Sequence, residues 1–395
     1  MVARDALFNP LAPEVLNDPF PVYRRLRETE PVYWHEQLRS WILTRHADCL
    51  AVLRNSDVFA NDFRRVGIPT PTPLLSLQTL DPPEQTPLRN FGVAAVRAQD
   101  HVALEADARR RADELLDRVA TKESFDFVRE FADPFTLGTM SYLVGVESPQ
   151  ANEAWDRMNA DLDRSMDSGL DPDSEEAGLA ARAAFSALVG TWLDGAPDKG
   201  ILGHIVSHGD GIDVSRDVLL NSVRAFWHAG FEVPSRFLGN AVLALLRDGE
   251  ALAALREGPV LDVAIDELVR FAGPVHVVSR ACTEDVRVGD RQLAKGDVVV
   301  VVLAAANRDP EQFDDPERLV LDRQPNPHLG FGRGAHSCLG LNVARMEGRV
   351  ALSSLLRHAG GLRLAGEPSQ RPNATLRGPA TLPVSVGAPA ALGTR

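Results

Sequence analysis

The strongest constraint on the fold is a long apolar segment at residues 214–247, which carries hydrophobic side chains on most sides of a helical repeat. A helix with this pattern runs through a core rather than over it, so other elements must surround it. The 395 residues are 44% hydrophobic and 25% charged, which is typical of a soluble globular enzyme and excludes a disordered or coiled-coil chain. We expect a single large domain over 1–395, mostly helical with small β-sheets.

Other local patterns support that fold class. Helical periodicity marks the ranges 48–58, 88–120, 124–145, 150–168, 174–194, 258–271 and 341–358. Residues 32–45 alternate as in a short hairpin, and residues 286–307 are typical of short strands around glycine turns. The Pro- and Thr-rich range 66–87 cannot be regular helix, and we interpret it as a long functional loop.

Charge and cysteine content restrict the partners and the compartment. The formal net charge of −13 argues against general binding to nucleic acid or to anionic membranes. Three widely spaced cysteines fit a reducing cytoplasm without a disulfide framework. The N-terminal residues contain no apolar stretch of a signal peptide or membrane anchor. We therefore expect a soluble cytoplasmic protein.

The segment 331–340 is the most informative part of the sequence for chemistry. Its glycines leave backbone N–H groups uncovered around Cys338, and a helix is predicted to begin directly after it. Both features favour an anionic sulfur, because the N-terminus of a helix and N–H donors stabilise a thiolate. No other Cys or His lies at zinc-like spacing, so a site with a single thiolate ligand fits better than a tetrahedral zinc site. The alternative is a buried structural cysteine on a glycine-rich turn.

This segment resembles the heme-binding signature of the cytochrome P450 heme-thiolate monooxygenases, F-G-x-G-x-H-x-C-x-G, and further landmarks of that family extend the resemblance over nearly the whole chain. Every fixed position of the signature is matched, by Phe331, Gly332, Gly334, His336, Cys338 and Gly340. The resemblance to the soluble bacterial class implies heme b (iron protoporphyrin IX) between a long distal helix, about 214–247, and the proximal loop 331–340. In the family the cysteine is the proximal iron ligand and donates electron density that favours O–O cleavage. We carry that role to Cys338, with Phe331 packed near the sulfur.

Two further landmarks concern ion pairs and the heme propionates. Glu267 and Arg270 match the family's E-x-x-R, and Arg318 matches the arginine that joins them, which implies a buried network that shapes the heme-binding core. By matching family positions, we expect three residues to bind the propionates, because arginine suits carboxylates. These are Arg89, Arg280 and His336. The family often has histidine where this chain has Gln85, so we expect that contact to be weaker or absent.

The distal helix departs from the family pattern A-G-x-(Asp/Glu)-Thr, in which the acid and the alcohol together deliver protons during oxygen activation. The segment here is Ala229-Gly230-Phe231-Glu232-Val233-Pro234. Val233 lacks the hydroxyl, and Ser235 is about 200° further around the helix. Pro234 also frees the carbonyl of Gly230 from its helical partner. We predict catalytic positions at Ala229, Gly230, Glu232 and Val233, with Glu232 either relaying protons or bonded structurally to nearby backbone.

The missing alcohol leaves several reactions open. A substrate hydroxyl or an ordered water replaces it in ordinary hydroxylation, or the enzyme couples or rearranges its substrate through radicals, or it uses hydrogen peroxide directly. A non-enzymatic alternative is a heme-thiolate sensor or ligand-binding protein. Largely apolar pocket walls, expected near 64–80, 155–190, 275–278 and 381–382, favour a hydrophobic or aromatic small molecule of secondary metabolism, and a substrate tethered to a carrier protein fits the same expectation.

Without a fused reductase, the resemblance implies electrons from a separate donor, such as ferredoxin with ferredoxin reductase. We predict that an acidic donor is steered by a basic patch on the cysteine side of the molecule. Its expected members are Arg97, Arg109, Arg110, Arg111, Arg333, Arg345 and Arg349.

Overall fold

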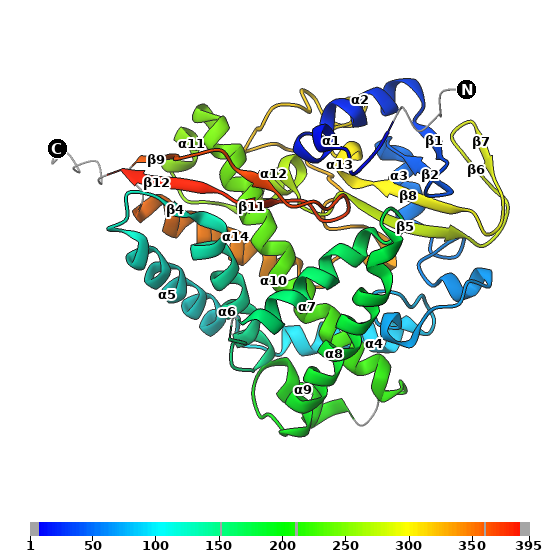
Figure 1. Ribbon diagram of the computed structural model, residues 1–395, viewed down its shortest axis with the longest axis horizontal. Helices are drawn as coiled ribbons and strands as arrows, with labels where there is room; N and C mark the ends of the chain where they lie inside the picture. The colour runs from blue at the N-terminus through cyan, green and yellow to red at the C-terminus, as the bar shows by residue number, and fades with distance from the viewer. Residues whose placement is uncertain (1–7, 151, 210–211, 359–360, 388–395) are drawn as a thin grey trace.

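The centre of the molecule is the helix α10, Arg216–Arg247, in a computed structural model that describes residues 8–150, 152–209, 212–358 and 361–387. The side-chain oxygen of Ser215 caps its first turn by accepting a hydrogen bond from the N–H of Val218. Figure 1 shows α10 passing through the molecule with helices on both sides. Its direct neighbours include α6 (Asp133–Val144), α8 (Glu175–Asp194), α12 (Asp262–Ala272) and α14 (Leu341–His358).

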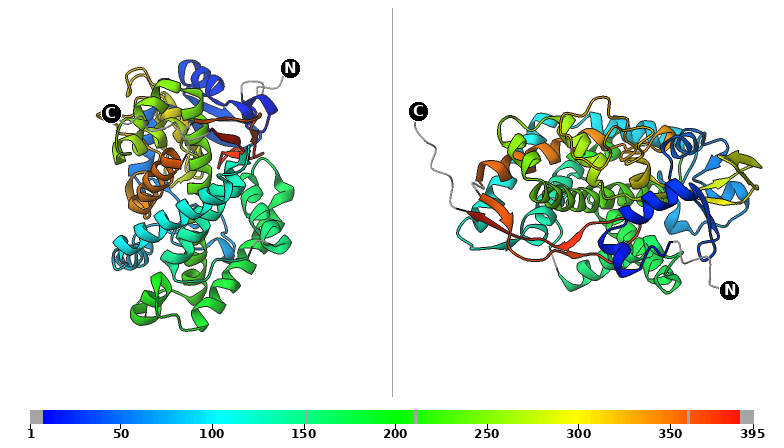
Figure 2. Two further views of the ribbon diagram at one scale, coloured as in Figure 1. Left: turned by 90° about the vertical axis from the view of Figure 1, so that its left-hand side faces the viewer. Right: turned by 90° about the horizontal axis from the view of Figure 1, so that it is seen from above.

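The other helices lie around this centre and confirm the predicted fold class, which is mostly helical with small sheets (Figure 2). They are α1 (Pro13–Asn17), α2 (Phe20–Thr29), α3 (His46–Arg54), α4 (Gln85–Arg97), α5 (His101–Val119), α7 (Glu153–Arg164), α9 (Gly200–His208), α11 (Gly249–Arg256) and α13 (Leu303–Ala306). The main hydrophobic core surrounds α10, and a second core lies between α3 and the largest sheet.

Two of the ranges predicted as a single helix contain more than one element. The range 88–120 contains two helices, because the chain turns after α4 and Asp100 caps α5 by accepting hydrogen bonds from the N–H groups of Val102 and Ala103. The range 124–145 starts with the strand β4 (Phe125–Asp126) and a π-helical turn before α6 begins at Asp133. The helix expected at 48–58 is α3, which begins earlier and ends at Arg54.

The largest sheet has five strands in the order β1-β2-β8-β5-β3. They are β1 (Val32–His35), β2 (Ser40–Leu43), β3 (Phe59–Ala60), β5 (Val277–Cys282) and β8 (Val298–Val302). The predicted hairpin over 32–45 is confirmed, with β1 and β2 antiparallel, whereas β2 and β8 pair in parallel. The run of five valines in β8 is central to the sheet, and most of its side chains are buried.

Three smaller sheets complete the fold. β6 (Val286–Val288) and β7 (Arg291–Leu293) form the expected hairpin around a glycine turn, with Gly289 at a φ of 56°. β10 (Ser369–Gln370) pairs with β11 (Pro379–Thr381), while β12 (Pro383–Gly387) lies between β4 and β9 (Gly361–Leu364). Across the described ranges, none of the helices combines the length and apolarity needed to cross a membrane.

Candidate functional site

A cavity of about 580 Å³ lies where α10, the strand β5 and the loop 330–340 meet. Its size is within the range of small-molecule and cofactor sites, and most of the side chains that line it are apolar. The helix α10 contributes Ser222, Phe226, Ala229, Gly230, Val233, Pro234 and Phe237, and the loop contributes Phe331, Gly332, Arg333, His336, Ser337, Cys338, Leu339 and Gly340. The structure therefore brings the distal and proximal segments to one cavity.

Backbone conformation shapes the loop that carries Cys338. Gly332 and Gly334 have φ angles of 66° and 73°, which glycine adopts without strain. A Cβ on Gly334 would lie 2.3 Å from the carbonyl oxygen of Leu53, so only glycine fits there. The N–H of Cys338 donates a 2.8 Å hydrogen bond to the carbonyl of Phe331, and α14 begins at Leu341. This turn directs the cysteine side chain toward the cavity.

The surroundings of Cys338 differ from those of the other two cysteines. Cys49 and Cys282 are fully buried, whereas Cys338 is accessible from the cavity it lines. Burial raises the pKa of the Cys338 thiol above its ordinary value, and the N–H of Gly340 and the charge of Arg89 offset this only in part, so the surrounding protein by itself does not favour the predicted thiolate. Among the three, Cys338 is thus the cysteine that a ligand in the cavity can reach.

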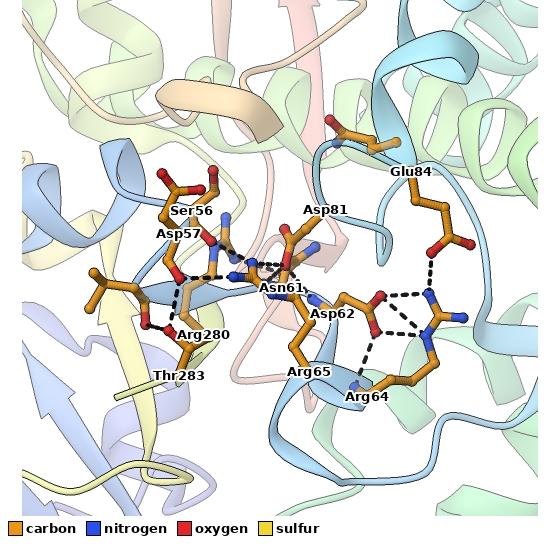
Figure 3. A network of polar contacts seen from close by, with 12 residues as sticks. Ser56, Asp57, Asn61, Asp62, Arg64, Arg65, Asp81, Glu84, Arg280 and Thr283 are labelled. Atoms are coloured by element: carbon orange, nitrogen blue, oxygen red, sulfur yellow. Dashed lines mark hydrogen bonds and ion pairs between the residues drawn. The ribbon is translucent and has the colours of Figure 1, made fainter. Parts of the chain in front are cut away.

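Two arginines at the cavity edge have only neutral hydrogen-bond acceptors. Arg89 donates from Nη2 to the carbonyl and hydroxyl oxygens of Ser337 at 2.7 and 3.0 Å. Arg280 donates from Nη1 to Oδ1 of Asn61 at 2.9 Å, a contact that Figure 3 shows together with neighbouring polar groups. Burial lowers the pKa of Arg280 to about 10. Within the described ranges neither guanidinium forms an ion pair with a carboxylate.

His336 also lines the cavity, but both of its ring nitrogens have protein partners. Nε2 lies 2.8 Å from Oδ1 of Asp81, and Nε2 of Gln85 donates to Nδ1 of His336 at 3.1 Å. Burial by itself raises the pKa of Asp81, yet the hydrogen bond from His336 and others hold it below its usual range. Gln85, at the position where the family often has histidine, therefore has a structural role, because its hydrogen bond orients the His336 ring.

On the distal helix, Ala229, Gly230 and Val233 line the cavity together with Pro234, but Glu232 does not. Of the two alternatives predicted for Glu232, a proton relay or a structural role, this placement favours the structural one, with arginine side chains rather than backbone as its partners. The carboxylate lies 2.7 Å from Nη2 of Arg236 and 3.6 Å from Nη1 of Arg371.

The electrostatics explain that placement. Burial raises the pKa of Glu232, but Arg236 and Arg371 outweigh it and lower the value to about 2, so the carboxylate stays ionised beside them. The hydroxyl of Ser235 donates to Asp133, also outside the cavity lining. The cavity face of the helix therefore offers no side-chain oxygen near Val233.

The predicted ion-pair network exists with a different third member. Glu267 and Arg270 are fully buried, with Nε to Oε2 at 2.7 Å. Arg323, not Arg318, donates to the same carboxylate, while Arg318 is mostly exposed beside Asp315. The chain turns between these two arginines, so the side chain of the later one enters the core.

Some of the segments predicted to form the cavity walls line the cavity, and others do not. The walls at 275–278 and at the end of 64–80 contribute Val275, Val277, Val278, Leu77, Gln78 and Thr79. No residue of 155–190 or 381–382 lines the cavity. Sequence reasoning missed Asn61, Glu347 and Thr375, whose contributions depend on long-range folding.

The predicted basic patch is largely neutralised by carboxylates. Arg109, Arg110 and Arg111 pair with Glu105, Asp107 and Glu114 on their own helix, and Arg345 and Arg349 pair with Asp266 and Asp262. Because these pairs cancel charge locally, the five arginines do not form a strong positive surface.

Comparisons with known proteins agree with this geometry. The family described as Cytochrome P450 matches residues 239–360. Cytochrome P450 107B1 of Saccharopolyspora erythraea is 33% identical over 390 residues, which cover 93% of this chain and 94% of that protein. The polyketide biosynthesis cytochrome P450 PksS of Bacillus subtilis is 28% identical, over 96% and 98% of the two chains.

Solved structures have the same fold. CalO2 superposes with a TM-score of 0.85 at 29% identity, covering 97% of this chain and 99% of that one. The structure of PksS gives a TM-score of 0.87 at 28% identity, covering 96% of this chain and 100% of that one. The fold is therefore shared over nearly the whole length of the chain.

Proposed function

This chain belongs to the cytochrome P450 family of heme-thiolate oxidoreductases, and we propose that it is a monooxygenase of a hydrophobic or aromatic small molecule, using dioxygen and an external electron donor. The observation that supports this most is a cavity in which a single accessible cysteine faces the apolar side of a long helix. We further propose that residues 1–395 act as one domain around the cofactor.

The cavity residues fit a heme b group. Cys338 is an accessible thiol at the N-terminus of a helix, and Arg89 and Arg280 are cations without carboxylate partners in the described ranges. Two such cations suit the two propionates of heme. The remaining lining is mostly apolar, which suits the porphyrin faces. When bound, an iron porphyrin with a thiolate ligand supplies the chemistry of oxygen activation.

In this proposal each protein group has a defined task. Cys338 is the iron ligand, held by the turn from Phe331 to Gly340, and Gly332 permits that turn. Arg89 and Arg280 hold the propionates, and His336 lies at the same edge with its ring oriented by neighbouring side chains. Ala229, Gly230 and Val233 form one wall of the cavity, and their side chains carry no hydrogen-bonding group.

The absence of a hydroxyl at Val233 and the position of Glu232 favour a proton source other than the distal helix side chains. We propose that a substrate hydroxyl or an ordered water, held in part by the free carbonyl of Gly230, takes that place. The same observation supports a second candidate, oxidative coupling, rearrangement or peroxide-driven oxidation on the same fold. A ligand-binding role without turnover remains the non-enzymatic alternative.

For the substrate, we propose an intermediate of secondary metabolism, because apolar residues dominate the cavity and a relative is named for polyketide biosynthesis. We also propose ferredoxin with ferredoxin reductase as the electron donor, and a carrier protein as a possible presenter of the substrate. Arg97 and Arg333 have no ion pair in the described ranges and are the remaining members of the predicted basic patch.

Carbon monoxide difference spectroscopy tests the core of this proposal. The reduced protein should give the far-shifted Soret band of thiolate ligation, Cys338→Ser should lose it, and the buried control Cys282→Ser should retain it. Turnover with a surrogate ferredoxin and reductase then separates an enzyme from a sensor, and hydrogen peroxide in their place separates the oxygenase from the peroxide-driven alternative. A Soret band unchanged in Cys338→Ser would overturn the assignment of the ligand.

A further inference from the structure

The Pro- and Thr-rich loop predicted at 66–87 has little secondary structure of its own. Between residue 67 and the start of α4, its one helical turn is η3 (Thr72–Leu74), and Pro71 before it is exposed. Three residues further along the same loop line the main cavity, namely Leu77, Gln78 and Thr79. The contacts that hold the loop in place therefore determine the shape of one cavity wall.

Two side chains of α10 bind the backbone carbonyls around this turn. The amide Nδ2 of Asn221 donates to the carbonyls of Thr72 and Leu75, at 2.8 and 3.0 Å. Nη2 of Arg224 donates to the carbonyl of Pro73 at 3.0 Å. Because a single turn satisfies few of its own carbonyls, these bonds give the loop partners that a longer helix would supply internally.

A third side chain fixes the two donors. The hydroxyl of Ser186, on α8, donates to Oδ1 of Asn221 at 2.7 Å and accepts from Nε of Arg224 at 3.0 Å. Since Oδ1 of Asn221 is thus an acceptor, Nδ2 of the same amide faces the loop. Ser222 adds a further link, because its hydroxyl accepts from the N–H of Leu77 at 2.8 Å. We call these four buried residues, Ser186, Asn221, Ser222 and Arg224, the loop clamp.

The charge of Arg224 is costly where it lies. Among the described residues no carboxylate pairs with it, and burial lowers the pKa of its guanidinium to about 10. Replacing buried charges by apolar side chains of similar volume is often neutral or stabilising. The charge is therefore not needed to pack α10 against α8. The distinct contribution of Arg224 is its hydrogen bonding to Ser186 and to the loop.

From these contacts we propose that the loop clamp determines which substrates fit the main cavity, because it fixes the wall formed by residues 77–79. Ser186, Asn221 and Arg224 do not line the cavity, so they are positioning residues that act through the loop. A loosened clamp lets the loop move toward solvent and widens the cavity on that side. This inference rests on the proposed function, since it concerns the substrate side of the same cavity.

Hydrogen exchange measured on the holoenzyme tests whether the clamp holds the loop. Asn221→Leu removes both donors to the loop without leaving a void, and amides within 72–79 should exchange about tenfold faster or more. The matched control is Asn240→Leu, because Asn240 of the same helix donates to the carbonyl of Arg377, outside the loop. It should leave the exchange of 72–79 unchanged. Equal exchange of this segment in the two variants would overturn the proposal.

Selectivity is tested with azoles, whose nitrogen binds heme iron and shifts the heme absorption. Asn221→Leu should bind the bulky azole clotrimazole several-fold more tightly than the wild type does, because the loop gives way. Imidazole is small and should bind both proteins equally. Asn240→Leu should resemble the wild type with both ligands. A ratio of the two affinities that stays constant across these proteins would reject the clamp as a determinant of specificity.

A milder variant keeps the test decisive if Asn221→Leu folds poorly. Ser222→Ala removes one oxygen, and Ser207→Ala is its control, since both hydroxyls also donate to the carbonyl one turn earlier. Faster exchange at Leu77 and the same change in azole ratio are expected only for Ser222→Ala. A normal carbon monoxide spectrum with unchanged exchange and selectivity rejects the clamp alone. A wild type without the thiolate Soret band rejects the proposed function instead, and the exchange result is unaffected by it.

Discussion

Arg323 lies with its Nε 3.1 Å from both carboxylate oxygens of Glu267, although 56 residues separate the two in the chain. Arg270 binds the same carboxylate through two nitrogens, at 2.7 and 2.8 Å, and the N–H of Val320 donates to it as well. Both oxygens of this fully buried carboxylate therefore accept hydrogen bonds from several donors. These hydrogen bonds and ion pairs offset the cost of removing the charge from water.

Removing Arg323 should therefore destabilise the fold, whereas removing Arg318 should have little effect. We expect Arg323→Leu to lower the free energy of unfolding by about 1.5–3 kcal/mol, because the buried carboxylate of Glu267 loses a charge-assisted donor and the carbonyl of Asp314 loses its hydrogen bond. Arg318→Leu should change it by less than about 0.5 kcal/mol, since that side chain is mostly exposed. Urea denaturation measures both. A larger loss in Arg318→Leu would contradict the pairing seen here.

The cluster of charged side chains around Asp163 should make the free energy of unfolding depend on pH. Asp163 lies among Glu232, Arg236, Arg371 and His228. Burial and the charge of Glu232 raise the pKa of Asp163 to about 7, from an ordinary value of 3.8. The folded state thus holds a proton that the unfolded state releases, so this group's stabilisation is complete below pH 3.8 and is lost as the pH rises to about 7.

Asp163→Asn removes that titration. It leaves the two carboxylates Glu232 and Asp133 balanced by the two arginines Arg236 and Arg371. Between pH 5 and pH 8 the wild type should lose at least about 1 kcal/mol more stability than the variant. Chemical denaturation across that interval is the measurement, and the exposed Asp156→Asn on the same helix is the control. Parallel curves for wild type and Asp163→Asn would rule out the linkage.

Arg280 should contribute to retention of the cofactor. Arg280→Ala removes a charge-assisted hydrogen bond worth about 1.5–3 kcal/mol, so heme should dissociate to apomyoglobin about tenfold faster or more. Arg287→Ala is the matched control, because its side chain donates a hydrogen bond to the carbonyl of Gly289 in its own hairpin and does not line the cavity. Identical dissociation rates for the two variants would remove Arg280 from the propionate site.

Val233→Thr tests what replaces the missing alcohol. The new hydroxyl can donate to the carbonyl one turn earlier, so the fold should tolerate it at a cost of about 1 kcal/mol or less. If the substrate or a water already supplies the proton route, turnover per electron consumed should rise little. Comparing product with electrons consumed in the two proteins gives the answer, and a large gain in coupling would contradict the proposed role of substrate or water.

Local sequence patterns were sufficient for the central helix and for the centre of the site. The apolar repeat of 216–247 requires a buried helix, and the glycines around Cys338 permit the turn that aims its sulfur into the cavity. Each of these inferences depends on residues that are neighbours along the chain. There the spacing of apolar residues and the conformational freedom of glycine determine the local structure directly. The fold class and the family followed from the same segments.

Only the tertiary structure decided which distant charges meet. Arg323 rather than Arg318 enters the core, and Glu232 turns to Arg236 and Arg371 instead of the cavity. Long side chains reach any of several partners at similar sequence separation, and the choice depends on how the surrounding elements pack.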